Sequence, residues 1–288
     1  MNAVAASGTF LLGGDLPIHR LGFGAMRITG PGIWGEPADP EAAKALLRRV
    51  VDLGIDFIDT ADSYGPEVSE RLIAEALYPY PEGLVVATKG GFTRHGPDIW
   101  KFVGHPDYLR QCVEMSLRRL RLERIDLYQI HRLDENFPLE DQLGVLADMR
   151  KEGKIRHIGL SEVSVEQIQA SRKLVDVVSV QNLYNLSNRQ SEDVLDYCER
   201  EGIGFIPWFP VAAGKLARTG GELDAFKARH HATTAQIALA WLLRRSPVML
   251  PIPGTSSIEH LEENAKAAEV QLTDEEFEVL NRLSAAGS

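Results

Sequence analysis

Cysteine is scarce in this chain, which has two among its 288 residues, Cys112 and Cys198. Both fall in stretches with a helical apolar pattern, and neither has a partner at the spacing of a metal site. They predict a reducing compartment without disulfides, and therefore a cytoplasmic protein. Long apolar runs are also missing. No stretch approaches the roughly 20 residues of a membrane span, and residues 1–20 lack the basic start of a secretory signal.

Basic residues are in deficit as well: 31 Lys and Arg stand against 41 Asp and Glu, for a net charge of -10. Without a basic stripe to neutralise phosphates, nucleic acid and membrane surfaces are excluded as partners. A few local cations are still enough for one small anion, so a nucleotide cofactor stays compatible with this charge. No linker or repeat divides the chain, and we expect one domain over residues 1–288 that forms a monomer or a weak oligomer.

What the chain does have is a regular alternation of short apolar runs and longer amphipathic ones. The runs predicted to be strands are 20–24, 56–59, 84–89, 125–131, 155–161, 177–182, 204–209 and 248–252. Helices are predicted near 40–53, 67–77, 107–121, 139–152, 164–174, 189–201, 233–245 and 257–268. Eight strand–helix units predict an α/β fold, a (β/α)₈ TIM barrel.

Two further elements are expected outside these units, a β-hairpin over residues 9–21 before the barrel and an extra C-terminal helix over 272–283. An open doubly wound sheet would also explain the alternation. It is less favoured because no GxGxxG motif opens a helix after the first strand.

In a barrel of this kind the chemistry lies where the strands end. Asp59 and Lys89 end the second and third predicted strands, and His131 ends the fourth. Tyr64 follows Asp59 by five residues. Each residue alone has a plain structural explanation, such as an ion pair, a hydrogen-bonded histidine or a packed tyrosine. Their convergence on one rim instead favours a site that delivers a proton to an oxygen.

The chemistry of this set is coherent. A charge as costly as that of Asp59 or Lys89 at the end of an apolar strand should be paired, so we expect the two to face each other. Tyrosine is a weak acid, with a reference pKa of about 10. A nearby lysine is expected to lower the pKa of Tyr64 by stabilising its phenolate, and His131 can orient a carbonyl. Neither a nucleophile with an activating base nor a metal cluster is evident.

These residues resemble the catalytic tetrad of the aldo-keto reductases. The supporting motifs are GFGAM, FIDTADSYG, VVATK, DLYQIHR, HIGLSE, VQNLYN and LPIPGTSSIEHLEEN. The resemblance implies a (β/α)₈ fold and reversible, nicotinamide-dependent reduction of aldehydes or ketones, usually with NADPH. It implies Tyr64 as general acid, Lys89 and Asp59 as its tuning pair, and His131 as the residue that orients the carbonyl.

The resemblance also implies a set of cofactor-binding residues. Ser161 and Gln181 match the pair that binds the nicotinamide amide, and Glu162 stands where the family often has Asn. Trp208 matches the aromatic residue that stacks on the nicotinamide. The remaining positions are Gly24, Met26, Phe209, Pro210, Val211, Ala212, Lys215, Leu216, Gly254, Thr255, Ser256, His260, Glu263 and Asn264.

The stretch PIPGTSSIEHLEEN, residues 251–264, carries glycine, hydroxyls and a helix start, the ingredients of an anion site. Ser256 and Glu259 have the spacing of a capping box. The resemblance implies that Thr255 and Ser256 bind the 2′-phosphate of NADPH. Many relatives carry lysine at Gly254 and arginine at His260, so we expect only a modest preference for NADPH, with NAD(H) also accepted. We expect that preference to shrink as the pH rises and histidine loses its charge.

The substrate pocket is expected among three long loops that carry Trp34, Phe92 and Trp100. The text AEALYPYP is similar to bacterial members that reduce pyridoxal, which suggests that substrate. Two rival functions stay open. One is a Schiff-base lyase that uses Lys89, and the other is a non-catalytic, nucleotide-sensing role of the potassium-channel β-subunit type.

Overall fold

The computed structural model describes residues 3–211 and 222–285 of the chain. In this part of the chain, seven parallel strands form one curved sheet and follow one another across it in chain order. They are β3 (Phe23–Gly24), β4 (Phe57–Asp59), β5 (Val85–Gly90), β8 (Ile125–Ile130), β9 (Ile155–Ser161), β10 (Val177–Leu183) and β11 (Gly204–Trp208). All match predicted strands.

The predicted eighth strand, residues 248–252, is not a regular strand, but it closes the barrel. On one side the N–H of Phe205 in β11 donates to the carbonyl oxygen of Val248 (2.8 Å), and that of Leu250 donates back to Phe205 (2.7 Å). On the other side the N–H of Gly22 donates to the carbonyl oxygen of Pro251 (2.9 Å). Pro251 and Pro253 have no N–H, so this segment cannot form a continuous ladder with either neighbour.

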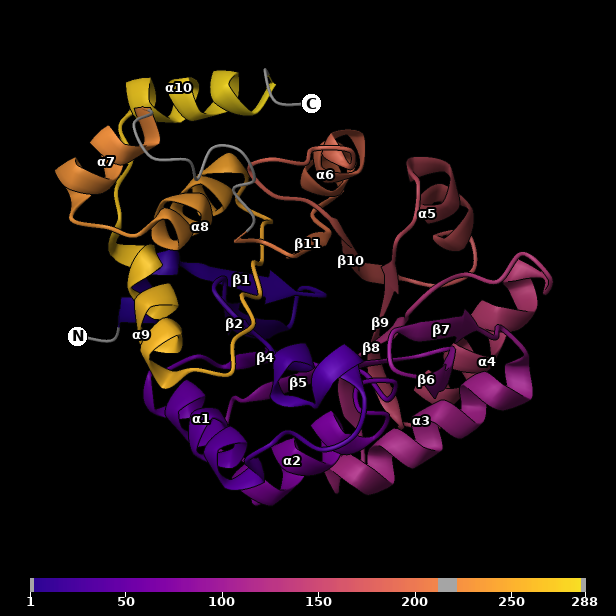
Figure 1. Cartoon of the computed structure of the whole chain (residues 1–288). Coiled ribbons are helices and arrows are strands. Elements are labelled where there is room, and N and C mark those ends of the chain that lie inside the picture. The colour runs from indigo at the N-terminus through magenta and orange to yellow at the C-terminus, as the bar shows by residue number, and fades with distance from the viewer. Residues whose placement is uncertain (1–2, 212–221, 286–288) are drawn as a thin grey trace.

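Helices surround the strands (Figure 1), and each strand leads into a helix on the outside. They are α1 (Pro40–Asp52), α2 (Val68–Leu77), α3 (Pro106–Leu120), α4 (Leu139–Lys151), α5 (Val165–Ser171), α6 (Glu192–Glu201), α8 (Thr234–Arg245) and α9 (Ile258–Lys266). These match the eight predicted helices, and the (β/α)₈ barrel is confirmed. The helix α7 (Glu222–His230) was not predicted. Among the described residues, no helix combines the length and apolar character needed to cross a membrane.

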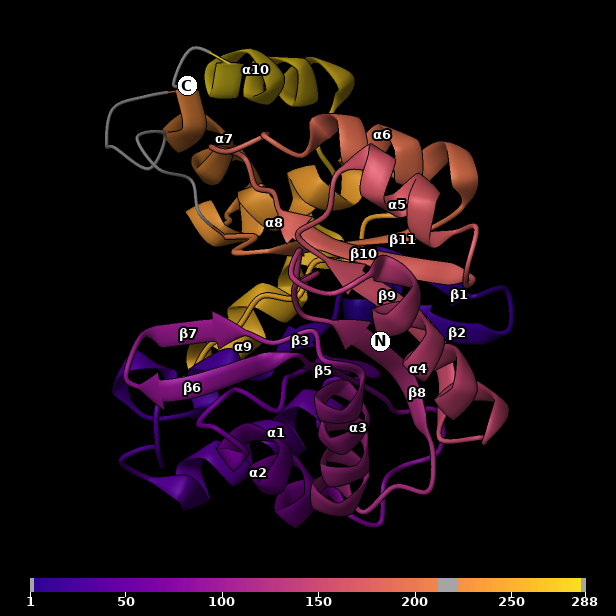
Figure 2. The ribbon, with the colours of Figure 1, turned by 90° about the vertical axis from the view of Figure 1, so that its right-hand side faces the viewer.

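Two hairpins lie at opposite ends of the barrel (Figure 2). The predicted hairpin, β1 (Thr9–Leu12) and β2 (Leu16–His19), is confirmed. Its Leu12 and Ile18 are fully buried with Phe57, Leu127 and Leu250, which closes that end with an apolar core. The second hairpin, β6 (Phe92–Gly96) and β7 (Ile99–Phe102), was not predicted. It lies at the end where the strands lead into the helices.

The starts of the last two helices bear on the predicted C-terminal elements. The extra helix α10 (Asp274–Ala285) is confirmed, and it is preceded by reciprocal hydrogen bonds between Thr273 and Glu276. The capping box predicted for Ser256 and Glu259 is wrong. Ser257 is the N-cap of α9, and its hydroxyl accepts from the N–H of His260, because the helix begins one residue later than the spacing suggested.

Candidate active site

Asp59 and Lys89 form an ion pair at the ends of the adjacent strands β4 and β5. The Lys89 side chain is 0% exposed and that of Asp59 2%, and the Lys89 Nζ atom lies 2.7 Å from Asp59 Oδ2. Lys89 Nζ also donates to the carbonyl oxygen of Thr60 (2.8 Å). The other carboxylate oxygen, Oδ1, accepts from the side-chain amides of Gln129 (3.1 Å) and Gln181 (2.9 Å). The expected pairing is therefore present, and both charges are well satisfied by hydrogen bonds.

Lys89 stays protonated despite its burial. Burial is the largest single influence and acts to lower the pKa of Lys89, but the charges and hydrogen bonds of Asp59 and Tyr64 together outweigh it and raise that pKa above its ordinary value. Gln129, which helps to hold the pair, was not predicted as a site residue. Its place in a buried strand, two residues before His131, was the only sequence signal for it.

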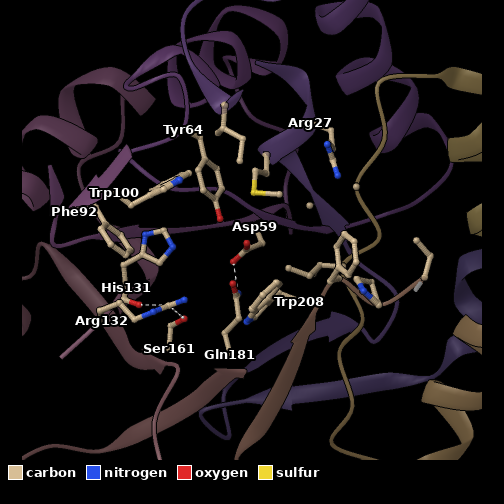
Figure 3. A pocket seen from close by; sticks show the side chains of 18 residues that line it. Arg27, Asp59, Tyr64, Phe92, Trp100, His131, Arg132, Ser161, Gln181 and Trp208 are labelled. Carbon is tan, nitrogen blue, oxygen red and sulfur yellow. Dashed lines mark hydrogen bonds between the residues drawn. The ribbon is translucent and has the colours of Figure 1, made fainter. Parts of the chain in front are cut away.

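Tyr64 lies in the turn after β4, with its hydroxyl toward Asp59 and the centre of the cavity (Figure 3). Its ring centroid is 5.2 Å from Lys89 Nζ. The expectation that Lys89 would lower the pKa of Tyr64 is wrong in its net direction. Burial raises the pKa of Tyr64 and outweighs the attraction of Lys89, and the charge of Asp59 acts in the same direction as burial. Tyr64 is therefore a protonated phenol at neutral pH.

His131 directly follows β8 and faces Tyr64, with 5.9 Å between the two ring centroids. Burial lowers its pKa well below the ordinary value, and the charges of Lys89, Arg132 and Arg94 lower it further. The imidazole is consequently neutral. Its Nδ1 lies 3.4 Å from the Ser63 hydroxyl, so the other ring nitrogen is left to face the cavity.

Aromatic residues of the β6–β7 hairpin form one wall of the site. The Phe92 ring meets the His131 ring edge to face at 4.6 Å between centroids. Trp100 packs on Phe92 (5.5 Å) and on Tyr64 (6.4 Å) in the same manner. Edge-to-face rings of this kind fix one another's orientation. Phe92 and Trp100 thus lie where a substrate pocket was expected.

Arg94 ties this hairpin to the rest of the site. Its guanidinium stacks on the Trp100 ring at 3.5 Å. It donates to the backbone oxygens of Ser63 (2.7 Å) and Ile33 (2.8 Å), and also to those of Gly32, Gly96 and Ile99. One side chain therefore connects the loop that carries Tyr64, the loop after β3 and the hairpin.

The groups described above surround a cavity of about 480 Å³. Most of the predicted site residues line it, together with four that were not predicted: Arg27, Ile33, Arg132 and Ile252. The full lining is Gly24, Met26, Arg27, Ile33, Asp59, Tyr64, Phe92, Trp100, His131, Arg132, Ser161, Gln181, Trp208, Phe209, Pro210, Val211, Ile252 and Gly254. Figure 3 shows these side chains. Arg27 and Arg132 each directly follow a predicted site residue in sequence, and this adjacency is the sequence signal for them.

The two side chains expected to bind the nicotinamide amide, Ser161 and Gln181, already form hydrogen bonds within the protein. Gln181 donates to Asp59, as described above, and the Ser161 hydroxyl oxygen accepts from Arg132 Nη1 at 3.0 Å. The Ser161 proton remains available for donation, because a hydroxyl can accept and donate at once.

The expectation that Glu162 points at the cofactor is not met. Glu162 is absent from the cavity lining. Its Oε1 accepts from the indole N–H of Trp208 (2.5 Å) and from the backbone N–H of Leu183 (2.7 Å). The physical reason is that the indole donor of the half-buried Trp208 needs an acceptor. Glu162 therefore orients Trp208, whose ring lines the cavity.

Glycines let β3 approach the closing segment at the edge of the cavity. A Cβ on Gly24 would lie 2.7 Å from the Ile252 carbonyl oxygen, and one on Gly254 would lie 2.7 Å from the Gly24 carbonyl oxygen. A lysine at 254 would therefore not fit this backbone contact. Instead, Arg27 packs beside Gly254. Arg27 Cγ lies 3.6 Å from the position that a Cβ on Gly254 would take. Arg27 brings a cation to a stretch, residues 251–264, that has no lysine or arginine of its own.

The other predicted cofactor residues lie away from the cavity lining, at the start of α9. Ser256 and His260 are exposed, Glu263 is half-buried, and Thr255 and Asn264 are buried. The Thr255 hydroxyl oxygen accepts from the N–H of Ser257 at 3.0 Å. The predicted positions Ala212, Lys215 and Leu216 lie outside the described residues.

Trp34, predicted for the substrate pocket, does not line the cavity. Its ring lies beside the Arg94 guanidinium, 5.7 Å from centroid to carbon, and its backbone forms a bridge with Gly65. Trp34 thus takes part in the bracing around Arg94 instead of facing the cavity.

A carboxyl group next to the tetrad differs from Asp59. Asp62 is buried, and burial and then the charge of Glu70 raise its pKa to about 7. Its Oδ1 has no hydrogen-bond partner within the described ranges. Asp62 is therefore largely protonated below neutral pH.

No group of three or more His, Cys, Asp and Glu side chains in residues 3–211 and 222–285 is placed to hold a metal ion.

Residues 20–285 match the model of the aldo/keto reductase family. The chain belongs to the aldo-keto reductases. It is 58% identical over 268 residues to an uncharacterized oxidoreductase of Schizosaccharomyces pombe, over 93% of this chain and 87% of that protein. It is 40% identical over 285 residues to pyridoxine 4-dehydrogenase of Escherichia coli, over 97% of this chain and 99% of the relative.

Among solved structures, the chain is similar to an aldo-keto reductase of Klebsiella pneumoniae in complex with NADPH. The TM-score is 0.81 at 28% identity, over 96% of this chain and 94% of the other. This aldo-keto reductase chain is thus an oxidoreductase with the barrel fold of its family.

Proposed function

We propose that this aldo-keto reductase reduces aldehydes, and some ketones, to alcohols with NADPH, and that Tyr64 is the general acid. The observation that carries the proposal is a neutral phenol at the cavity centre, backed by the buried Lys89–Asp59 pair. The NADPH complex of the Klebsiella pneumoniae relative supports the choice of cofactor. When bound, NADPH supplies the hydride that reaches the carbonyl carbon.

Side chains of the protein then supply the proton that the reduction needs. Hydride transfer makes the carbonyl oxygen negative, and Tyr64 donates its hydroxyl proton to that oxygen. Lys89, 5.2 Å from the Tyr64 ring, stabilises the phenolate that remains. His131 is neutral with Nδ1 near Ser63, so the opposite nitrogen can donate a hydrogen bond that orients the carbonyl. One hydride and one proton together give the alcohol, and solvent reprotonates Tyr64.

Cofactor binding is divided between two regions. Ser161, Gln181 and Trp208 line the inner part of the cavity, where the nicotinamide would lie. Trp208, held by Glu162, offers a ring for stacking. The phosphate groups would lie toward Gly254, Arg27 and the start of α9, where a helix N-terminus favours anions. Because this outer region has few cations, we expect NADPH to be preferred by a modest margin, with NADH also used.

Pyridoxal is a specific candidate substrate. The support is the 40% identity, over nearly the full length of both chains, to a protein named pyridoxine 4-dehydrogenase. The chemistry of the family is reversible, so oxidation of pyridoxine and reduction of pyridoxal are opposite directions of one reaction.

The Schiff-base alternative is disfavoured by the state of Lys89. A lysine nucleophile must be neutral and must reach the substrate. Lys89 is fully buried, is absent from the cavity lining and has a raised pKa. The channel-subunit alternative shares this fold, and an activity assay separates the two.

The test is a panel of aldehydes that includes pyridoxal and 4-nitrobenzaldehyde, assayed by NADPH and NADH oxidation. We expect turnover with NADPH, and slower or weaker turnover with NADH. Borohydride added with substrate should leave no adduct on Lys89. Cofactor binding without turnover of any aldehyde would favour the nucleotide-sensing role, and a trapped adduct would favour the lyase.

A further inference from the structure

Arg132 is a cation in the cavity that the proposed chemistry does not use. It follows His131 and lines the cavity next to Phe92, with 5.7 Å from its guanidinium carbon to the ring centroid. Its Nη1 donates to the backbone oxygen of His131 (2.6 Å) and to the Ser161 hydroxyl (3.0 Å). Both acceptors are uncharged.

No carboxylate pairs with Arg132 in the part of the chain described here. The charge of Glu162 acts on Arg132, but the Glu162 carboxylate accepts its hydrogen bonds from Trp208 and Leu183. The other carboxylate at the cavity, Asp59, is paired with Lys89. The Nε and Nη2 groups of Arg132 have no hydrogen-bond partner among residues 3–211 and 222–285. Burial lowers the pKa of Arg132 from its usual value and outweighs the opposing charge of Glu162, as expected for a partly dehydrated cation without an ion-pair partner.

Partial burial of a guanidinium that has only neutral partners costs desolvation free energy, unless a bound anion pairs with its charge. At the tetrad end of the cavity, Arg132 thus carries a positive charge that forms no ion pair among the described residues. Arg27 is the other cation of the lining, but it is exposed and lies beside Gly254, toward the start of α9. An anion bound at Arg132 would gain a charge-assisted hydrogen bond that a neutral ligand cannot make.

The position of Arg132 limits where that anion can be on a substrate. Arg132 is the next residue after His131 and binds the backbone oxygen of His131. The charge of Arg132 acts on the tetrad directly, since it lowers the pKa of both His131 and Tyr64. A carbonyl held between Tyr64 and His131 would therefore bring a neighbouring oxygen to Arg132, while a group at the far end of a ring would point elsewhere.

We propose that Arg132 binds an anionic oxygen next to the reacting carbonyl, and that the preferred substrates are aldehydes with a phenolate ortho to the carbonyl. This proposal rests on the reductase function and names its substrate class. The phenolic oxygen of pyridoxal is ortho to its aldehyde and therefore belongs to the class. The ion pair fixes the orientation of the ring, while the Ser161 proton remains free for the cofactor.

The test uses two isomers that are both anionic at neutral pH, 2-hydroxy-5-nitrobenzaldehyde and 4-hydroxy-3-nitrobenzaldehyde. Only the first has its phenolate ortho to the carbonyl. We measure the ratio of kcat/KM for the ortho over the para isomer in wild type, Arg132→Gln and Arg132→Lys. The expected result is a ratio well above one in wild type, and a fall of roughly 10- to 100-fold in Arg132→Gln. Arg132→Lys should retain part of the ratio, because it keeps the charge and loses the fork geometry.

Arg27→Gln is the matched control, because it also removes one arginine from the cavity lining. It should keep the wild-type ratio. Equal ratios in wild type and Arg132→Gln would overturn the proposal. An equal loss for both isomers, with a raised Kd for NADPH, would overturn it too, and would assign Arg132 to the cofactor. Circular dichroism checks that each variant is folded.

A binding measurement separates failure of this inference from failure of the reductase function. Each isomer is titrated into the protein with NADP⁺, where no reduction occurs, and the nitrophenolate absorbance reports binding. Tighter binding of the ortho isomer in wild type, lost in Arg132→Gln, supports the anion subsite even without turnover. Indistinguishable Kd values for the two isomers contradict it even if 4-nitrobenzaldehyde is reduced.

Discussion

The two ends of the cavity are built on different principles. At the tetrad end, Lys89 and Asp59 are almost fully buried. Lys89 Nζ and both carboxylate oxygens of Asp59 form hydrogen bonds within the protein. At the outer end, Arg27 is exposed, as is His260 beyond the lining at the start of α9, and their side chains form no ion pair in the described part of the chain. The first end is organised before any ligand binds. The second is completed only by a ligand, so its contribution should appear in binding and not in stability.

The largest effect, on the free energy of unfolding, is expected from breaking the buried pair of Asp59 and Lys89. Asp59→Asn leaves the Lys89 charge buried without its counter-ion, and should lower the free energy of unfolding by about 3 to 5 kcal/mol. Asp59→Asn combined with Lys89→Met removes both charges and should cost clearly less. Urea denaturation of the two variants measures this difference. Equal losses would mean that the pair is not a coupled unit.

The next effect tests Asp62, a buried carboxyl next to the tetrad that forms no ion pair among the described residues. The folded-state pKa of Asp62, about 7, lies above its unfolded value of 3.8. The folded state therefore holds the proton more tightly, and stability is lost as the pH rises from 3.8 through 7. Asp62→Asn removes this loss. Its stability relative to wild type should rise by roughly 2 to 3 kcal/mol between pH 5 and pH 8. A difference that is the same at both pH values would show that Asp62 ionises normally.

A smaller effect should follow from loosening the wall that holds the tetrad loop. Arg94→Lys keeps the charge but cannot reach the five carbonyl groups that Arg94 now joins. We expect kcat/KM for 4-nitrobenzaldehyde to fall roughly 10- to 100-fold through misplacement of Tyr64 and Trp100. The Kd of NADPH should change much less, because the hairpin lies away from the outer end. Equal changes in both quantities would indicate general unfolding instead.

The smallest effect belongs to the exposed outer end. Arg27→Gln should raise the Kd of NADPH by roughly two- to fivefold, the size expected for an exposed ion pair. It should leave the free energy of unfolding near that of wild type. Titration with both NADPH and NADH shows which phosphate is involved: the 2′-phosphate if only NADPH is affected, the diphosphate if both are. No change with either cofactor would contradict a role for Arg27.

The barrel could be predicted from sequence because its signals are local. Strand runs such as 155–161, and caps such as Ser164 with Gln167, carry their own evidence. The β6–β7 hairpin could not be predicted in this way. Its segment Thr93–Gly96 is polar, and it is held by the contacts of Arg94 with loops about 30 and 60 residues earlier. Pro251 and Pro253 likewise prevented the eighth predicted segment from forming a regular strand.

The candidate site shows the same division. The order of Asp59, Tyr64, Lys89 and His131 was readable because strand ends meet on one rim. The direction of the pKa shift of Tyr64 was not, since it depends on how burial compares with the charge of Lys89. The role of Glu162 also could not be read from sequence, because its partner Trp208 is 46 residues away.

The most direct test of the account is the single-turnover rate of aldehyde reduction by Tyr64→Phe with saturating NADPH. This variant removes only the hydroxyl that is proposed to donate the proton. We expect the rate to fall by roughly 10²- to 10⁴-fold, with a Kd for NADPH close to that of wild type. A Tyr64→Phe protein that reduces 4-nitrobenzaldehyde at the wild-type rate would contradict the central claim.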